Sequence, residues 1–504
     1  MQPIVPPSQS DPPLILSLDL GSSSLRALLF DAAGRTVAGM QARRAHSLHT
    51  DSSGAAVADA DALIRLTFEC IDETLALAGP LVEDIAAVAG CTIVGNMLGV
   101  DAGGQAVTPL FTYADTRAAE DAELLKRELD EESFHQRTGV RFHPSYGSVQ
   151  LHWLRRARSQ EFQRVARWIS LGEHLEARLF GAGGTSHSVA SWSGLLDRLR
   201  LDWNAELLAT LSLEPENLPR LASFASPRQG LRSEFAQRWP ALAAVPWFPL
   251  IGDGAAANLG SGCVSPQRVA LTMGTSTALR AVTGDLVAHL PAGLWCYRVD
   301  ERRSLPGGAL TEGGNMYAWL QASLKLAEAD QVEAALAAAE PDGHGLTVLP
   351  FLAGERAPGW AGHARATIHG VTLATRPEDI VRASLEAVAY RIALVYADLR
   401  SLLPDEPQII VSGGALASSP AWMQIVADAL GRPLTHSAVP EASARGAALL
   451  ALEALGALSS IELAPDFLGD TVQPNPARFD VYQRAIARQQ ALYNTLVRQR
   501  QPAS

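Results

Sequence analysis

The sequence predicts a mixed α/β protein that is divided into two domains of similar design. Its 504 residues exceed the roughly 100–200 residues of a typical single domain. Short apolar segments that end in glycine alternate with longer segments of helical periodicity, which is typical of an α/β fold. A hairpin-like pattern also occurs twice, around Gly21 and around Gly274, about half a chain apart. This repetition favours two domains, each with its own core.

The first copy of the pattern lies near the beginning of the chain. Residues 14–20 are apolar and stop at Gly21, which predicts a buried strand. Ser22 to Ser24 form the expected turn, and residues 25–31 form the second strand of a β-hairpin. Asp19 stands just before the tip of this hairpin, where a carboxylate can hold a phosphate-bound Mg²⁺ through water.

The second copy has predicted strands at 269–273 and 278–282. Backbone N–H groups and hydroxyls at such tips can cradle phosphate oxygens. One hairpin of this kind is explained as an ordinary Gly-Ser turn, but two of them favour a phosphate-binding site. The residues expected to bind phosphate are Gly21, Ser22 and Ser23 in the first tip and Gly274, Thr275 and Ser276 in the second.

Further elements are predicted along the rest of the chain. A helix is expected at 118–130, two helical stretches at 162–180, a loop-rich stretch at 213–239 and an interdomain segment at 241–249. The second half is expected to contain helices at 378–402, 420–430, 446–458 and 481–498, and a buried strand at 408–411.

Composition and charge limit the classes of function. The net charge is −12 and no long run of Lys or Arg is present, which argues against a nucleic-acid partner. The four cysteines form no C-x-x-C pair, which argues against zinc sites and disulfides. No apolar segment reaches the roughly 18–20 residues of a membrane span, and the first 13 residues lack the pattern of a signal peptide. We therefore expect a cytoplasmic protein without a membrane partner.

Two glycine-containing segments are candidates for binding and catalysis. Asp253 lies between Gly252 and Gly254, where it either caps a helix or faces a ligand that the glycines allow to approach. Gly413 and Gly414 follow a strand and precede a helix, where they form a tight turn or let adenine or phosphate approach the backbone. The chain lacks G-x-x-x-x-G-K-[ST], so it is not a P-loop enzyme. It also lacks the H-E-x-x-H motif of zinc proteases and the G-x-S-x-G motif of serine hydrolases.

Seven segments in order and spacing resemble the FGGY carbohydrate kinases over nearly the whole chain, about residues 14 to 495. Each motif is modest alone, and the ordered set of seven is specific. The segments are 19–24 (DLGSSS), 113–117 (YADTR), 252–254 (GDG), 274–276 (GTS), 354–358 (GERAP), 382–386 (RASLE) and 412–415 (SGGA).

The resemblance implies a fold and domain boundaries. The family is similar to actin and the seventy-kilodalton heat-shock ATPases, with two ribonuclease-H-like domains and an interdomain cleft for ATP and sugar. The expected N-terminal domain covers 14–249 and holds the sugar side and the first phosphate hairpin. The expected C-terminal domain covers 250–470 and holds the catalytic aspartate and the ATP side, and a helical tail covers 471–504.

The resemblance also implies roles by position. Asp253 would be the general base for the sugar hydroxyl, Asp19 would hold Mg²⁺ at the phosphates, and residues 274–276 would cover the transferring phosphoryl group. ATP and Mg²⁺ are therefore the expected cosubstrate and metal. Adenosine would lie beside Gly413, Gly414 and Ala415, and the sugar beside Asp115, Arg117 and His143.

Several stretches most resemble the gluconokinases of this family, which implies phosphorylation of gluconate to 6-phosphogluconate. They are 112–117, 295–297, 352–358 and 441–446. The Met-His pair that often contacts the sugar is missing at Val94-Gly95, and Tyr113 stands where Trp is common. A ketopentose such as xylulose, or a polyol, is therefore the alternative substrate, and Asn96 is a candidate to replace part of the lost contact.

The expected sugar-side residues have structural alternatives. Arg117 either binds a substrate carboxylate or pairs with Asp115 to fix its own loop, and His143 beside a proline also fits a structural role. An inactive sugar-sensing protein and an actin-like or chaperone-type ATPase are rival classes on the same fold. Retention of Asp19 and Asp253 argues against the first, and the sugar-side segments argue against the second. A homodimer is compatible with the sequence, which does not determine the oligomeric state.

Overall fold

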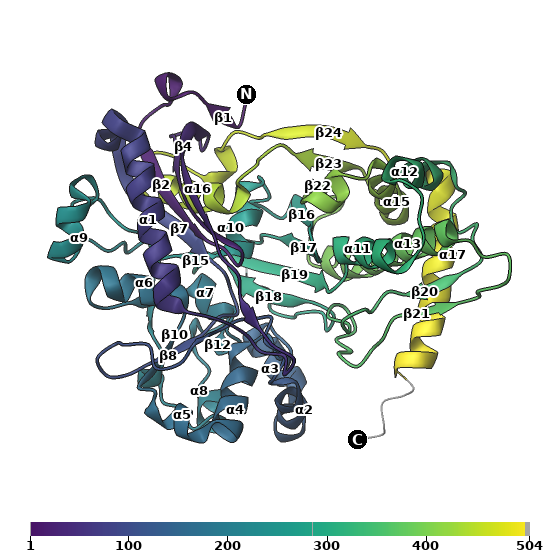
Figure 1. Ribbon diagram of the computed structural model, residues 1–504, viewed down its shortest axis with the longest axis horizontal. Coiled ribbons are helices and arrows are strands. Elements are labelled where there is room, and N and C mark those ends of the chain that lie inside the picture. The colour runs from purple at the N-terminus through teal and green to yellow at the C-terminus, as the bar shows by residue number, and fades with distance from the viewer. Residues whose placement is uncertain (1, 285, 499–504) are drawn as a thin grey trace.

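The computed structural model describes residues 2–284 and 286–498. Two large sheets lie in separate halves of the molecule, and two helices lie between them (Figure 1). These helices are α10 (Asp253–Gly260) and α16 (Ala442–Ala454).

The first sheet has six strands in the order β1-β4-β3-β2-β7-β15. The central strand β2 is buried along its whole length, and its alternating side chains enter two cores. Leu16 and Leu18 face the core that includes α1 (Ala60–Ala78), whereas Ile15 and Ser17 face α16. The strands are β1 (Ile4–Val5), β2 (Leu14–Leu20), β3 (Ser24–Phe30), β4 (Thr36–Ala45), β7 (Ile85–Thr92) and β15 (Ile251–Gly252).

The second sheet has seven strands in the order β18-β19-β17-β16-β22-β23-β24. Three long helices, α13 (Pro377–Arg400), α15 (Pro420–Leu430) and α17 (Pro476–Tyr493), lie in this half of the molecule (Figure 1). Its strands are β16 (Arg268–Met273), β17 (Thr277–Ala281), β18 (Trp295–Arg298), β19 (Ser304–Leu310), β22 (Gln408–Ser412), β23 (Leu434–Ser437) and β24 (Leu468–Val472).

The two sheets share one design. In each, a hairpin continues into a third antiparallel strand on one side, and two parallel strands follow on the other side. This is the ribonuclease-H-like arrangement. The predicted duplication of the hairpin is therefore confirmed, with β2–β3 in the first half and β16–β17 in the second.

The helices between the sheets cross at a pair of glycines. A Cβ at Gly260 would lie 1.8 Å from the carbonyl oxygen of Ala442, and a Cβ at Gly446 would lie 1.9 Å from that of Ala256. Only glycine permits this close approach of two backbones. Because α10 follows β15 directly, the crossing connects the end of the first sheet to α16.

The remaining elements complete both halves. The smaller strands are β5 (His49–Thr50), β6 (Ala56–Ala58), β8 (Leu98–Val100), β9 (Leu110–Phe111), β10 (Arg167–Ile169), β11 (Gly184–Ser186), β12 (Leu196–Asp197), β13 (Asp202–Trp203), β14 (Arg220–Ala222), β20 (Thr347–Leu349) and β21 (Thr367–His369). The other helices are α2 (Ala119–Glu128), α3 (Glu131–Thr138), α4 (Gly147–Ala157), α5 (Ser159–Arg164), α6 (Leu171–Phe180), α7 (His187–Ser191), α8 (Ala205–Thr210), α9 (Ser233–Arg238), α11 (Gly314–Ser323), α12 (Ala329–Ala338) and α14 (Gly414–Ala417).

Three expected segments differ from the structure. The stretch 162–180 contains strand β10 between its two helices. The segment 241–249 is not a linker, because the backbone of Pro246 and Phe248 pairs with Val88 of β7 and extends the first sheet. The expected boundary at residue 470 falls inside β24, and α17 packs on α15 rather than forming a separate tail.

All four cysteines are free and buried. Among the described residues, no helix is both long enough and apolar enough to cross a membrane.

Candidate active site

Two cavities meet at the tip of the second hairpin. One has a volume of about 310 Å³ and is lined by Ser276, Asp253 and Ser22 among others. The other has a volume of about 690 Å³ and is lined by Gly274, Thr275 and residues of α11, α14 and α15. We refer to them as the base cavity and the glycine cavity. The three residues of the tip thus separate two spaces of ligand size.

Asp253 lines the base cavity at the first position of α10. Its Oδ1 accepts a hydrogen bond from the backbone N–H of Gly254 at 2.7 Å. Burial, followed by the negative charge of Asp19, raises the pKa of the Asp253 carboxyl to about 7, against the opposing effects of Gly254 and Arg280. A carboxylate of this pKa is suited to accept a proton near neutral pH.

Asp19 lies at the end of β2, on the same face of the sheet as Ser17, and is 6% exposed. Its carboxylate is 3.5 Å from Arg26 Nη1 and accepts a contact from the Cys91 thiol at 3.4 Å. Arg26 is bound more closely to Glu441, at 2.6 Å. Burial raises the pKa of Asp19, opposed by Arg26. The negative charge of Asp19 disfavours ionisation of Asp253, and a bound divalent cation would offset this repulsion.

The wall of the base cavity is rich in N–H donors that have no acceptor. Arg280, Arg356, Trp192 and Trp295 all line it. The Nε of each arginine and the Nε1 of each tryptophan are buried without a hydrogen-bond partner. Because buried donors are normally paired, this surplus indicates a ligand that carries many oxygen acceptors.

The two sides of the base cavity come from both halves of the chain. Trp192, which directly follows α7, stacks on Tyr297 of β18 with ring centroids 3.5 Å apart. The hydroxyl groups of Tyr146 and Tyr297 are 2.7 Å apart. All three aromatic residues form part of the cavity wall.

The segment 354–358 places its two charged side chains in different surroundings. Glu355 is 2% exposed and accepts hydrogen bonds from Arg391 of α13 and from the hydroxyl of Tyr493 of α17. Arg356, the next residue, lines the base cavity. The backbone of the segment is tied to β19 through the Ala357 N–H, which donates to Ala309 at 3.0 Å. The segment therefore presents Arg356 from a loop that α13 and α17 hold in place.

Gly413 and Gly414 connect β22 to α14 beside the second hairpin. Gly413 has a φ of +96°, and a Cβ there would lie 2.3 Å from the carbonyl oxygen of Met273. Gly414 lines the glycine cavity, and a Cβ there would meet nothing within 4 Å. Ala415 lines the same cavity. A side chain at position 414 would thus occupy ligand space.

The second tip is held by the start of α11. The backbone N–H of Gly314 donates to Gly274 at 2.8 Å, and that of Asn315 donates to Thr275 at 3.1 Å. Thr275 and Ser276 remain exposed. In the first tip, Gly21 pairs with Ser24, Ser22 lines the base cavity, and Ser23 is exposed. The two hairpin tips therefore meet near one cavity, as expected for a shared phosphate site.

Asp115 and Arg117 line neither cavity. Arg117 Nη2 lies 2.6 Å from the Asp115 carboxylate, which also accepts the backbone N–H of Ala56. The guanidinium of Arg117 stacks on Trp153, 4.7 Å from the ring centre. The structure thus corresponds to the loop-fixing interpretation of this pair. Tyr113 of the same segment does line the base cavity.

His143 lies behind the cavity wall. Its Nδ1 is 2.8 Å from Ser145 Oγ, and its ring contacts Tyr146; Ser145 and Tyr146 both line the base cavity. Burial, and then the charge of Arg356, lowers the pKa of His143 to about 3. His143 is therefore neutral and supports the residues that face the ligand.

Gly95 lines the base cavity without a side chain. A Cβ at this position would lie 2.9 Å from the backbone of Ser145 and 3.0 Å from Tyr113, at a φ of +61°. Asn96 does not replace the missing contact, because its amide donates to Ile93 and its carbonyl accepts the N–H of Leu171.

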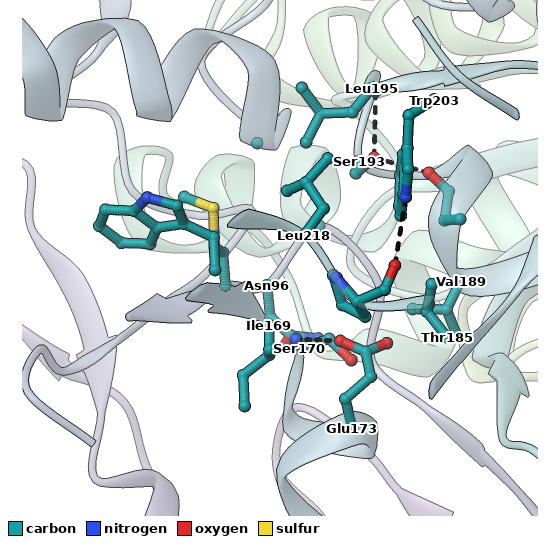
Figure 2. Close-up of a pocket in the computed structure, with 16 residues that line it drawn as sticks. Asn96, Ile169, Ser170, Glu173, Thr185, Val189, Ser193, Leu195, Trp203 and Leu218 are labelled. Atoms are coloured by element: carbon teal, nitrogen blue, oxygen red, sulfur yellow. Dashed lines mark hydrogen bonds between the residues drawn. The ribbon is translucent and has the colours of Figure 1, made fainter. Parts of the chain in front are cut away.

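Asn96 instead lines a third, smaller cavity of about 50 Å³. Figure 2 shows Ser170 and Glu173 at one end of this cavity and Trp203 at the other. Glu173 is committed to the backbone N–H of Ser170 at the start of α6. The acidic side chain that lines this cavity is therefore engaged in capping a helix.

Several residues of the base cavity were missed by sequence reasoning. Arg356 lies within the 354–358 motif and Arg280 lies four residues after Ser276, so the sequence could have identified both as candidates. Trp192 directly follows a short helix with no motif around it, and no sequence signal identifies it.

Comparisons with known proteins agree with this geometry. Residues 14–260 match the N-terminal domain, and residues 269–455 the C-terminal domain, of the FGGY family of carbohydrate kinases. The chain is 26% identical to a gluconokinase of Bacillus subtilis over 92% of this chain and 91% of the relative. It is 30% identical to a glycerol kinase of Aromatoleum aromaticum over 89% and 91%.

Solved structures show the same fold. A gluconate kinase from Lactobacillus acidophilus superposes with a TM-score of 0.88 at 24% identity, covering 96% of this chain and 98% of that one. A structure described as a xylulose kinase from the same species gives the same TM-score, identity and coverage.

Proposed function

Because this chain belongs to the FGGY family of carbohydrate kinases, we propose that it transfers the γ-phosphoryl group of ATP to gluconate and forms 6-phosphogluconate. The observation that carries the choice of substrate is the base cavity. It holds two arginines and one aspartate, and its four buried donors without partners suit an anionic, hydroxyl-rich ligand. The gluconokinase and gluconate kinase among the similar proteins support the same choice.

Asp253 acts as the general base in this proposal. Its carboxylate accepts the proton of the attacking sugar hydroxyl as that oxygen bonds to the γ-phosphorus. A positioned base of this kind typically contributes about 10²–10⁴ in rate. The Gly254 N–H keeps the carboxylate oriented, and the pKa of about 7 leaves a substantial ionised fraction at neutral pH.

The glycine cavity supports binding of ATP. Its volume of about 690 Å³ and its lining by Gly414, Ala415 and Trp422 fit a flat base beside an open backbone. No lysine or arginine is among the described residues that line it. Backbone N–H groups of the 274–276 tip would therefore contact the phosphates directly.

The donors near the two tips fit a magnesium ion. Asp19 is a hard oxygen ligand, and its negative charge, after burial, contributes to the raised pKa of Asp253. When bound there through Asp19, Mg²⁺ would neutralise charge on the phosphoryl oxygens. Asp19 would hold the ion, and Arg26 would keep Asp19 in place.

A panel of substrates tests the proposal. ADP release would be measured with gluconate, xylulose, ribulose, glycerol and a six-carbon polyol, each with and without enzyme. We expect gluconate to give the highest kcat/KM. Brisk turnover of xylulose with none of gluconate would favour the ketopentose alternative and leave the carbohydrate kinase assignment standing.

The cellular setting and assembly follow as further proposals. We propose a cytoplasmic enzyme, which the four free and buried thiols support. A homodimer stays a prediction, and sedimentation of the purified protein is its test.

A further inference from the structure

We propose that Arg356 binds the carboxylate of the substrate and thereby selects a sugar acid over a neutral sugar. The inference rests on the proposed function, because it assigns a role inside the same cavity. It gives Arg356 a role in the choice of substrate, whereas proton transfer is assigned to Asp253.

Arg356 is available for a ligand. Its guanidinium hydrogen-bonds the side chain of Tyr146, but its Nε is buried without a hydrogen-bond partner. The neighbouring carboxylate of Glu355 is already paired with Arg391, and no ion pair to Arg356 is found in the described part of the chain. A partly buried guanidinium without an anion is costly, and a carboxylate is the group that matches its two-point geometry.

The two arginines that line the base cavity have different neighbours. Arg280 lies at the reacting end, where its Nη1 is 3.3 Å from the Gly254 carbonyl and its charge acts on Asp253. Arg356 lies near Tyr146 and His143, whose pKa values it lowers. Because the charge of Arg280 already acts on Asp253, Arg356 is the arginine that is left for the substrate carboxylate.

The loop that carries Arg356 is well fixed for this task. Glu355 is anchored to α13 and α17 through Arg391 and Tyr493, and Ala357 is anchored to β19. Glu355 and Arg356 are adjacent along the chain. The contacts that hold Glu355 in place therefore also restrict the position of Arg356. Such support is what a precise two-point contact requires.

Arg117, the cation expected from the sequence, is already occupied. Its guanidinium is paired with Asp115 and stacked on Trp153, and it lines no cavity. The carboxylate contact is thus better assigned to Arg356.

The test compares gluconate with gluconamide, its neutral isostere. We expect Arg356→Met to lower kcat/KM for gluconate by roughly 10- to 100-fold, the range of a lost hydrogen bond to a charged group. The value for gluconamide should be nearly unchanged. Arg356→Lys keeps the charge without the fork and should give an intermediate loss for gluconate.

Two controls make the result specific. Arg365→Met removes an arginine nine residues further along the chain that donates to the carbonyls of Gly362 and Ala364, and it should leave the preference for gluconate intact. Arg117→Met should do the same. Calorimetric ATP binding shows that each variant is folded.

The outcomes separate the two proposals. Equal losses on gluconate and gluconamide in both Arg356 variants would overturn the role of Arg356 and leave the proposed function standing. Failure of the unmodified enzyme to phosphorylate gluconate, with turnover of neutral sugars, would overturn both.

Discussion

Asp253 is the single side chain on which the proposed chemistry depends. We expect Asp253→Asn to lose about three orders of magnitude in kcat, within the usual contribution of a general base. The asparagine can still accept the Gly254 N–H, so the helix start should be preserved. Steady-state kinetics measure the loss, and calorimetry should show nearly unchanged ATP affinity. Near-normal turnover would remove Asp253 from the mechanism.

The pKa of Asp253 predicts a pH dependence with a defined sign. The carboxyl has a pKa of about 7, and only its ionised form can accept a proton. The kcat/KM should therefore be constant above this value and fall about tenfold per pH unit below it. Rates with both substrates below their KM, from pH 5.5 to 8.5, report this titration. The residual activity of Asp253→Asn should lack the inflection, and a profile flat from pH 6 to 8 would contradict the assignment.

Single residues were predictable from the sequence where a motif enclosed them. Asp253, Gly414 and Ser276 lie in short segments with glycine on one side, and all three line the cavities. Arg117 was not assigned by the sequence, because whether it pairs with Asp115 or meets a ligand depends on the loop conformation. Trp192 reaches the base cavity only through the packing of α7 against β18, which spacing does not reveal.

At the junction of β22 and α14, Gly414 borders the open space of the glycine cavity. We expect Gly414→Val to weaken ATP binding at least tenfold and sugar binding little, because its side chain would enter the glycine cavity. Calorimetry with ATP and with gluconate measures both. Gly284→Val is the matched control, since Gly284 also has open space beside it and lines neither cavity. Unchanged ATP affinity in Gly414→Val would place adenosine elsewhere.

Helices and strands were predictable where a periodic or continuous apolar pattern ended at a proline or glycine. The prediction of 420–430 matches α15, because proline begins that helix and Gly431 ends it. The hairpin β16–β17 was recognisable from apolar runs that flank Gly274. Segment 241–249 was misread because its prolines suggested a linker, whereas its backbone completes an edge of the first sheet. Pairing partners so distant along the chain leave no local pattern.

The crossing of α10 and α16 joins the two halves of the molecule. We expect Gly446→Ala to lower the free energy of unfolding by about 1–3 kcal/mol, because its methyl group would meet the Ala256 backbone at 1.9 Å. Displacement of α10 should also lower kcat by about 10- to 100-fold, since Asp253 begins that helix. Urea denaturation and kinetics measure both, with Gly284→Ala as the control. Unfolding curves and rates equal to those of the parent would show that the crossing tolerates a side chain.

At the scale of the whole molecule, the duplicated hairpin predicted two related sheets correctly. The boundaries between the domains were harder to predict from the sequence. Helix α16 lies late in the chain yet packs on β2 and β7 of the first sheet, and α17 supports Arg356 through Tyr493 and Glu355. We propose that the division near residue 250 separates the domains, whereas residues 471–498 belong structurally to the second half.

The tip at 274–276 has two sides, and one ligand would touch each. A loop of three residues cannot be ordered by a nucleotide without also changing the surface that the sugar meets. Thermodynamic linkage then requires that gluconate alter the affinity for ATP by the same factor as ATP alters the affinity for gluconate. The hydrogen bonds from Gly314 and Asn315 to this tip determine how large that factor is, because a loop that is already ordered has less conformational entropy for the first ligand to remove.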